Sequence, residues 1–201
     1  IRDRFYLAKM VKNAKIGESP EFIKKRLLAA GMRPINNVVD ISNYVMLEFG
    51  QPLHFFDKNR LGNHILVRDA KDKEEVITLD GKRRILSSND IVITDGNRPV
   101  CIAGVMGGEN TEVEQDTTDI LIEAAIFDPV SIRYTAANLD LRSEASIRYG
   151  KGLSYEYTEM ALKRACHLLE KYAGATILSG CIRHDVIDKT CLLYTSDAAD
   201  D

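Results

Sequence analysis

The sequence of 201 residues has no tryptophan, and no apolar run approaches the roughly 20 residues that a membrane-spanning helix requires. Its four cysteines form no C-x-x-C pair and have no zinc-finger spacing. We therefore expect buried free thiols in a reducing compartment, a cytoplasmic location, no metal site and no membrane contact. The four are Cys101, Cys166, Cys181 and Cys191.

An excess of charge of one sign is also missing. The chain has 27 Lys and Arg against 30 Asp and Glu, a formal net charge of -3. That balance excludes a general nucleic-acid coat, which needs many uncompensated cations, so a bound RNA would be held at a local patch. The 45% hydrophobic and 28% charged residues are typical of a globular protein. The length predicts one large domain or two small ones.

Both ends of the sequence suggest a piece of something longer. Residues 1–5 have no initiator Met and no signal-peptide pattern, so we expect a fragment. Residues 191–201 resemble a translated sequencing adapter, so we expect a module over residues 1–190 and a non-native tail after it. The alternative is a genuine acidic tail. Without the three aspartates of this segment the net charge would be 0.

Hydrophobic periodicity predicts an α+β fold, with a strand-rich centre, a mixed or antiparallel sheet and helices at both ends. Helices are expected at residues 19–31, 37–49, 128–139 and 154–172. Strands are expected at residues 65–67, 76–79, 91–93, 100–102, 120–125 and 177–187. Ser19 is the expected N-cap of the first helix, and Asp80-Gly81 is a hairpin turn signal.

Glu123 interrupts an apolar predicted strand and is therefore expected to be at least partly buried. A buried carboxylate is costly unless it is paired or hydrogen-bonded. One interpretation is a salt bridge to an arginine such as Arg148. The other is a polar hook at the bottom of an apolar pocket.

His54 lies just after a predicted helix end, in a segment that we expect to be a loop. An imidazole there can serve as a general base, although an isolated histidine is more often structural. His64, His167 and His184 have no neighbouring constellation and are expected to be structural. No Gly-x-Ser-x-Gly elbow and no cysteine nucleophile motif is present.

Two further segments have candidate chemistry. In the glycine-rich stretch 103–109, Gly107 and Gly108 can present backbone amides to a carbonyl or an oxyanion; the alternative is a plain turn. The segment 141–152 is expected to be a loop, with Arg142, Arg148 and Lys151 beside an aromatic residue. Such a set can hold the phosphates and bases of a single-stranded RNA end, and the alternative is a basic surface loop.

Four motifs occur in order at residues 33–46, 50–54, 103–108 and 142–146. Together they closely resemble the bacterial phenylalanyl-tRNA synthetase beta subunit, over residues 5–189. The matching part is the editing module that its third and fourth domains form. This module hydrolyses the ester of tyrosine wrongly attached to the phenylalanine tRNA. The family enzyme is an α2β2 tetramer that charges tRNA with phenylalanine using ATP and Mg²⁺, and its synthetic site lies in the alpha subunit.

The resemblance implies a role for each residue that matches the family pattern. Glu123 falls at the acceptor for the tyrosine hydroxyl, and His54 at a histidine implicated in editing. Arg142, Arg148 and Lys151 are then contacts for the 3′ end of tRNA(Phe), and this part needs no cofactor. Ser42 and Ser143 stand where many relatives have Thr, and segment 150–154 lacks an acidic residue that many carry. The remaining pocket residues implied are Ser42, Asn43, Gly107, Gly108, Ser143 and Ala145.

Two alternatives to an editing module remain open. The first is a non-catalytic scaffold that binds the tRNA end or another subunit through an inactive pocket. The second is a freestanding hydrolase that edits in trans. For the reaction itself, the sequence leaves open whether His54 or the terminal ribose hydroxyl activates the attacking water.

Overall fold

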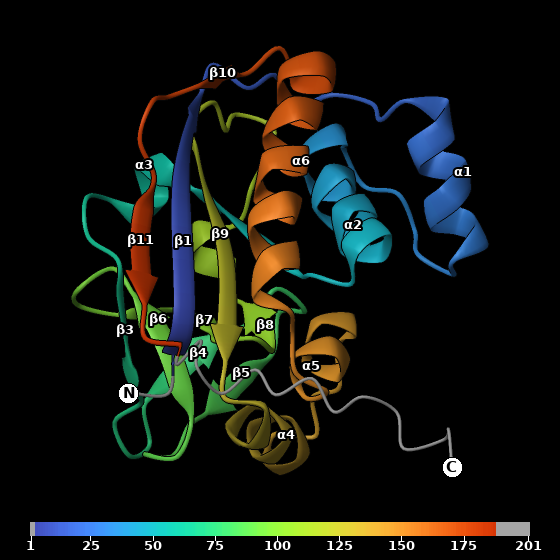
Figure 1. Cartoon of the computed structure of the whole chain (residues 1–201). Helices are drawn as coiled ribbons and strands as arrows, with labels where there is room; N and C mark the ends of the chain where they lie inside the picture. Colours follow the sequence, from blue (N-terminus) through green and yellow to red (C-terminus); the bar gives the residue numbers. More distant parts are fainter. Residues whose placement is uncertain (1–2, 188–201) are drawn as a thin grey trace, which may run out of the picture.

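A five-stranded antiparallel sheet forms the centre of the molecule in the computed structural model, which describes residues 3–187 (Figure 1). Strand β9 lies between β1 and β2, and the far edge of β1 pairs with both β10 and β11. This arrangement joins strands from both ends of the chain. The strands are β1 (Asp3–Lys12), β2 (Leu53–Asp57), β9 (Ile120–Phe127), β10 (Thr176–Ile177) and β11 (Ile182–Asp185).

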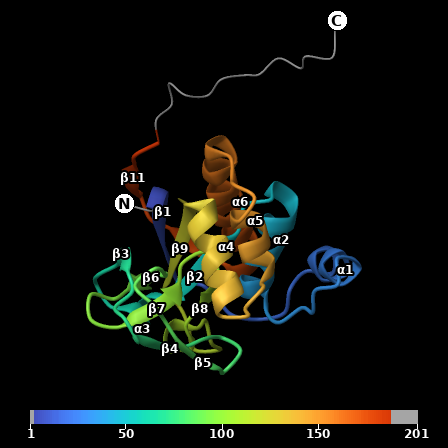
Figure 2. The same cartoon turned by 90° about the horizontal axis from the view of Figure 1, so that it is seen from below.

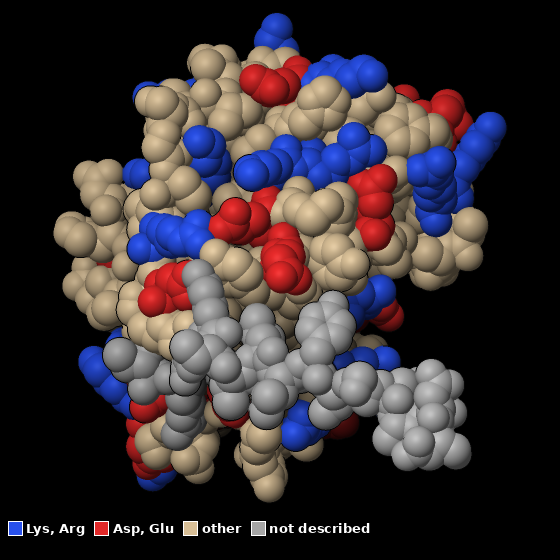
Figure 3. All heavy atoms as spheres, in the orientation of Figure 1, with Lys and Arg blue, Asp and Glu red and all other residues tan. Residues whose placement is uncertain are grey.

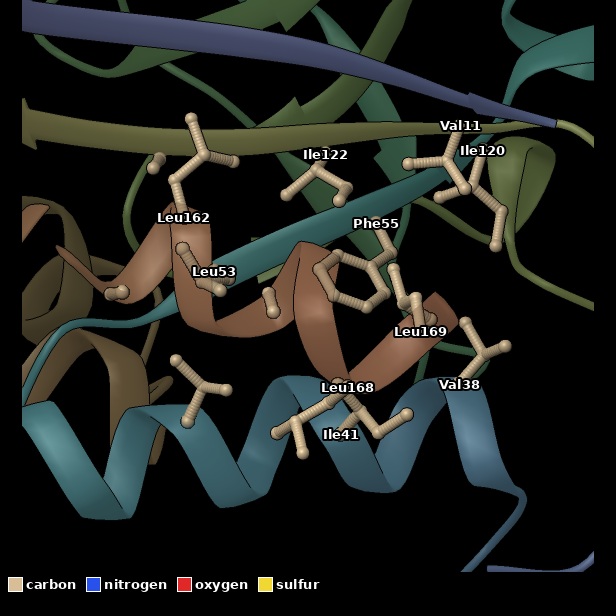
Figure 4. Packing of buried hydrophobic residues seen from close by; sticks show 14 of the residues in the cluster. Val11, Val38, Ile41, Leu53, Phe55, Ile120, Ile122, Leu162, Leu168 and Leu169 are labelled. Carbon is tan, nitrogen blue, oxygen red and sulfur yellow. The ribbon is translucent and has the colours of Figure 1, made fainter. Parts of the chain in front are cut away.

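One face of this sheet is covered by two long helices, α2 (Asn37–Phe49) and α6 (Tyr155–Ala173). The shorter α1 (Glu21–Ala29) packs against α2 on the outside, as Figure 1 shows. Between the sheet and the helices lies a layer of apolar side chains (Figure 4). It is built by side chains such as Phe55, Ile122 and Leu168, each contributing about 1.5–3 kcal/mol of burial.

The other face is covered by smaller elements, of which the short strands lie together on one side of the main sheet in Figure 2. A four-stranded sheet has the order β3-β6-β7-β8, and β4 and β5 form a hairpin. These strands are β3 (Leu66–Asp69), β4 (Glu75–Ile77), β5 (Arg83–Ile85), β6 (Ile91–Thr94), β7 (Pro99–Ile102) and β8 (Met106–Gly107). The short helices are α3 (Lys58–Leu61), η1 (Glu109–Thr111), α4 (Pro129–Asn138) and α5 (Glu144–Tyr149).

The alternation of side chains along a strand divides the core into two clusters. On β1, Phe5 and Leu7 face the helices, whereas Tyr6 and Ala8 face the small sheet. Strand β9 is buried at every position because both of its faces are covered. The cluster on the side of the small sheet includes Tyr6, Ala8, Phe56, Leu121, Ala125 and Phe127.

The predicted α+β class is confirmed, with antiparallel sheets and helices in both halves of the chain. The helix predicted at 37–49 is confirmed residue for residue. Asn36 caps it by accepting a hydrogen bond from the Val39 amide, and Gly50 ends it at φ 69°. The Asp80-Gly81 turn joins β4 to β5, as its turn chemistry predicts.

Four predictions about local structure were wrong. Ser19 does not cap α1, because its hydroxyl donates to Asp40 and Pro20 takes the cap position. His54 lies in strand β2, where pairing with β9 holds it, and not in a loop. The segment 141–152 contains α5, and the strand expected at 177–187 is two strands that both pair with β1.

The cysteines also differ from expectation in one respect. Cys101, Cys166 and Cys181 are free thiols, but only Cys101 is buried and Cys181 is exposed. Cys191 and the predicted tail at 191–201 lie outside the described residues. Between residues 3 and 187, no helix combines the length and the apolar character that a membrane crossing requires.

Charges of both signs are interspersed on the face that carries α6 (Figure 3). Exposed pairs contribute to this pattern, among them Arg164 with Glu48 and Arg183 with Glu159. Such pairs add little stability individually. In the described part of this face, acidic side chains therefore lie beside the basic ones.

Asp40 offers a test of the connection between α1 and α2. Its buried carboxylate accepts from the Ser19 hydroxyl at 2.5 Å and from the Ile35 amide at 2.8 Å. We expect Asp40→Ala to lower the free energy of unfolding by about 2–3 kcal/mol in urea titrations, because two donors lose their acceptor. Asp72→Ala removes an exposed carboxylate and should change the free energy of unfolding by less than about 0.5 kcal/mol. Equal effects would contradict this role of Asp40.

Candidate functional site

A cavity of about 210 Å³ lies between the main sheet and the small sheet. It is smaller than the roughly 300–1,000 Å³ of typical small-molecule sites, and so matches a single amino-acid side chain better than a nucleotide. Its walls come from α2, β2, β7, β8, β9 and α5. The polar and functional lining residues are Ser42, Asn43, His54, Cys101, Gly107, Glu123, Ser143, Glu144 and Tyr149.

Glu123 projects from the middle of β9 toward this cavity and is only 3% exposed. The predicted salt bridge to Arg148 does not form, because Arg148 pairs with Glu144 at 2.6 Å. Instead, the Tyr6 hydroxyl donates to Oε2 of Glu123 at 2.8 Å. Burial raises the pKa of the Glu123 carboxyl to about 8, although the Tyr6 hydrogen bond opposes the shift. The carboxyl is therefore mainly protonated at neutral pH.

His54 stands directly opposite Glu123 in the pairing of β2 with β9. Its ring packs edge-on against Phe56, with the ring centroids 4.3 Å apart. Nε2 is buried and has no hydrogen-bond partner among the described residues. Burial lowers the pKa of His54 to about 4, so the imidazole is neutral at pH 7.

The two glycines that the sequence singled out have different surroundings. A methyl group added to Gly107 would overlap the His54 ring, so the missing side chain allows β8 to approach the imidazole. Gly108 does not line the cavity, and its amide donates to the Val100 carbonyl at 2.8 Å. The expectation that Gly108 holds an oxyanion is corrected accordingly, since its donor is already used within the sheet.

Two predicted pocket serines shape the wall with hydroxyls that are already engaged. Ser42 donates to the Leu53 carbonyl at 2.9 Å, which ties α2 to β2. Ser143 caps α5 by accepting from the Ser146 amide and donates to the Val105 carbonyl at 2.5 Å. Asn43 and Ala145 also line the cavity, and the Asn43 amide makes no hydrogen bond within residues 3–187. Asn43 is thus available to a ligand.

The three predicted RNA-contacting cations do not form one group. Arg142 and Lys151 line a separate groove of about 480 Å³ between α4 and α5, and neither has an ion pair in the described part of the chain. Arg133 lines the same groove and donates to the Gly150 carbonyl at 2.5 Å. Arg148 is neutralised by Glu144 on its own helix. Helix α5 thus has the cavity on one side and this basic groove on the other.

Several residues of the site were not predicted from the sequence. Tyr6 was missed because the whole of β1 was missed, although the run from Phe5 to Val11 is mostly apolar. Cys101 lines the cavity from β7, and burial raises its pKa well above that of an ordinary thiol. Within residues 3–187, no group of three or more His, Cys, Asp or Glu side chains is placed to hold a metal ion.

Comparison with known proteins gives the family. The family model described as "B3/4 domain" matches residues 2–174. This chain belongs to the B3/4 domain family. The sequence of this B3/4 domain is also similar to phenylalanine–tRNA ligase beta subunits. It is 56% identical to that of Staphylococcus saprophyticus over 177 residues, and 55% identical to that of Dehalococcoides mccartyi over 178 residues.

In both comparisons the aligned region is 88% of this chain and 22% of the relative, so the B3/4 domain spans about a fifth of those subunits. The fold also matches a crystal structure of an N-terminal fragment of the phenylalanyl-tRNA synthetase beta subunit from Pyrococcus horikoshii. The TM-score is 0.55 at 13% identity, covering 89% of this chain and 49% of that one. The resemblance inferred from the four motifs is confirmed.

The buried carboxyl of this B3/4 domain predicts an unusual dependence of stability on pH. Its pKa rises from 4.5 to about 8 on folding, so folding takes up a proton. The contribution of Glu123 to stability is complete below pH 4.5 and is lost as the pH rises through 8. Gln at this position cannot ionise. We therefore expect Glu123→Gln to raise the free energy of unfolding above that of the native chain, by a small amount at pH 5 and by something on the order of 3 kcal/mol at pH 9.

Thermal unfolding between pH 5 and 9 measures this difference. Glu75→Gln is the matched control, because its exposed carboxylate pairs with Arg83, which lowers its pKa below 4.5. The unfolding temperature of Glu75→Gln should therefore change with pH in the same way as that of the native chain between pH 5 and 9. If the unfolding temperature of Glu123→Gln also follows that of the native chain at every pH, the pKa of Glu123 is not raised by folding.

Proposed function

We propose that this B3/4 domain is the editing module of a phenylalanine–tRNA ligase beta subunit. In this role it hydrolyses the ester between tyrosine and tRNA(Phe). The observation that carries the proposal is the one buried carboxyl group of the cavity lining, Glu123, in a cavity sized for one side chain. The similarity to beta subunits supports the same conclusion.

Glu123 supplies the distinction between tyrosine and phenylalanine, which differ by one hydroxyl group. One carboxyl oxygen accepts from Tyr6, and the other has no hydrogen bond among the described residues. A substrate phenol can bond to this second oxygen, whereas a phenyl ring leaves it unpaired. Sites built to hydrogen-bond a substrate hydroxyl reject the analogue that lacks it by about 10⁴-fold or more.

Hydrolysis requires water to add to the ester carbonyl carbon and the ribose oxygen to leave with a proton. His54 is neutral at pH 7, and its pKa of about 4 makes it a weak base. We assign it the orientation of the attacking water, with the terminal ribose hydroxyl as the competing activator. Gly107, on the cavity wall, is the remaining glycine candidate for holding the developing oxyanion. Asn43 is available to bind the amino acid or the ribose.

The RNA strand itself would meet the cations outside the cavity. Arg142 and Lys151 in the groove behind α5 can neutralise phosphates of the single-stranded 3′ end. Arg148 contributes less, because Glu144 already pairs with it. In the proposed whole enzyme, tRNA(Phe) and the alpha subunit of an α2β2 tetramer are the partners, in the cytoplasm.

ATP and Mg²⁺ belong to the synthetic reaction of that whole enzyme. The cavity described above is lined by two carboxyl groups and by no Lys or Arg. This lining does not fit a triphosphate, which needs several cations or free amides. No step of the proposed hydrolysis passes through either group.

Glu123→Ala tests the selectivity. We expect the rate of Tyr-tRNA deacylation by the complete enzyme to fall about 10- to 100-fold, as the loss of a hydrogen bond to a buried carboxyl implies, with little change for Phe-tRNA. Glu75→Ala, which removes an exposed carboxylate on β4, should leave both rates unchanged. An unaltered preference for tyrosine in Glu123→Ala would contradict the proposed hydrogen bond between Glu123 and the substrate hydroxyl. If the native enzyme hydrolyses neither ester, a non-catalytic scaffold is favoured.

His54→Ala tests the chemical step. We expect kcat for Tyr-tRNA deacylation to fall by about 10²-fold, because the attacking water loses the group that orients it, while the tyrosine preference persists. His64→Ala, which removes an exposed imidazole, is the control and should have no effect. If His54→Ala hydrolyses at the native rate, water activation belongs to the ribose hydroxyl and His54 is structural.

A further inference from the structure

Tyr6 lies behind the cavity and does not line it. It sits on β1 opposite Ala125 of β9, two residues from Ala8, which is paired with Glu123. The side chain is 4% exposed, and its ring packs in the cluster between the two sheets. Only its hydroxyl points at the site, where it donates to Oε2 of Glu123 at 2.8 Å.

Within residues 3–187, the Tyr6 hydroxyl makes the one hydrogen bond to the Glu123 carboxyl. The ionisable side chains around it are Tyr6 from β1, His54 from β2, Cys101 from β7 and Tyr149 from α5. Of these, Tyr6 is the one that hydrogen-bonds to the carboxyl, and no ion pair within residues 3–187 includes Glu123. Without the Tyr6 hydroxyl, the carboxyl would be buried with no protein partner.

We propose that Tyr6 is a positioning residue for substrate selectivity: its hydroxyl holds one oxygen of Glu123 so that the other oxygen faces the cavity. The two phenols, one resident and one on the substrate, would then share a single carboxyl group. This inference rests on the proposed function, because it needs Glu123 to receive the substrate hydroxyl.

The selectivity gain comes from preorganisation. A free glutamate side chain has several rotamers, and fixing one of them on binding costs conformational entropy. Tyr6 is held by β-sheet pairing and by packing, so this cost is met when the protein folds. Only tyrosine binds better as a result, because a phenylalanine ring makes no hydrogen bond to the Glu123 oxygen that faces the cavity. Tyr6 therefore affects selectivity without touching the substrate.

Tyr6→Phe removes only the hydroxyl and keeps the buried ring. In the complete enzyme we expect kcat/KM for Tyr-tRNA deacylation to fall about tenfold, and that for Phe-tRNA to stay within about twofold. In a Glu123→Ala background, Tyr6→Phe should have no further effect on selectivity, because it acts through Glu123. Its bond to Tyr6 lowers the pKa of Glu123, so the pH profile for Tyr-tRNA should also move to higher pH.

Tyr44→Phe is the matched control. Tyr44 is equally buried, on the opposite side of the main sheet, and its hydroxyl bonds to Arg26 and Glu48. Its loss should leave selectivity and pH profile unchanged. If Tyr6→Phe fails to assemble, 3-fluorotyrosine at position 6 keeps the ring and is a stronger donor, so the profile should move to lower pH.

The outcomes separate the two proposals. Suppose that Glu123→Ala abolishes the tyrosine preference, whereas Tyr6→Phe has the native preference and the native pH profile. The positioning role of Tyr6 is then overturned and the editing function stands. Additive losses in Tyr6→Phe and Glu123→Ala would also overturn it, since they indicate a purely structural tyrosine. If Glu123→Ala itself has no effect on selectivity, the proposed function fails first.

Discussion

Burial of β9 on both faces is the constraint on which the other elements depend. An eight-residue strand with every position buried needs a layer on each side, and the two layers here are unlike. Helices α2 and α6 cover one face with apolar side chains, and the small sheets cover the other. Glu123 is the single ionisable residue on this strand, and it points to the second layer. The polar site therefore forms where the main sheet faces the small sheet.

Local signals predicted much of the fold but not its long-range pairing. The helix at 37–49 has its own cap and its own terminating glycine, so the sequence alone defines it. Strand β1 has no comparable local signal. It is stabilised by β9 and by the distant C-terminal strands β10 and β11. His54 was assigned to a loop for the same reason, because β2 is a strand only through its pairing with β9.

The candidate site was predictable in its chemistry and less so in its geometry. A carboxylate inside an apolar strand correctly indicated burial at Glu123, but its partner on β1 lies 117 residues away in the chain. Ser42 and Ser143 line the cavity, and their hydroxyls bond to backbone carbonyls. The cations were grouped because they are close in sequence. In the structure Arg142 and Lys151 do share one groove, whereas Arg148 lies on α5 and pairs with Glu144 one turn earlier on the same helix.

The separation across α5 gives the two sides of this helix different electrostatic properties. At neutral pH the interior of the cavity has a protonated Glu123 and an uncharged His54, because burial shifts both pKa values toward the neutral forms, and Glu144 in the wall pairs with Arg148. Such a cavity can take an uncharged aromatic side chain with one hydroxyl, but it offers nothing to offset a phosphate. Arg142 and Lys151 lie on the far side, in a groove open to solvent, where charges keep their hydration until an anion arrives. An aminoacyl ester joins these two chemistries in one molecule, with a neutral side chain at one end and a polyanion at the other. The helix between them places its capped N-terminus, Ser143, at the cavity wall, and Arg142, the residue before it, in the groove. A change that shifts this cap would therefore disturb both contacts at once.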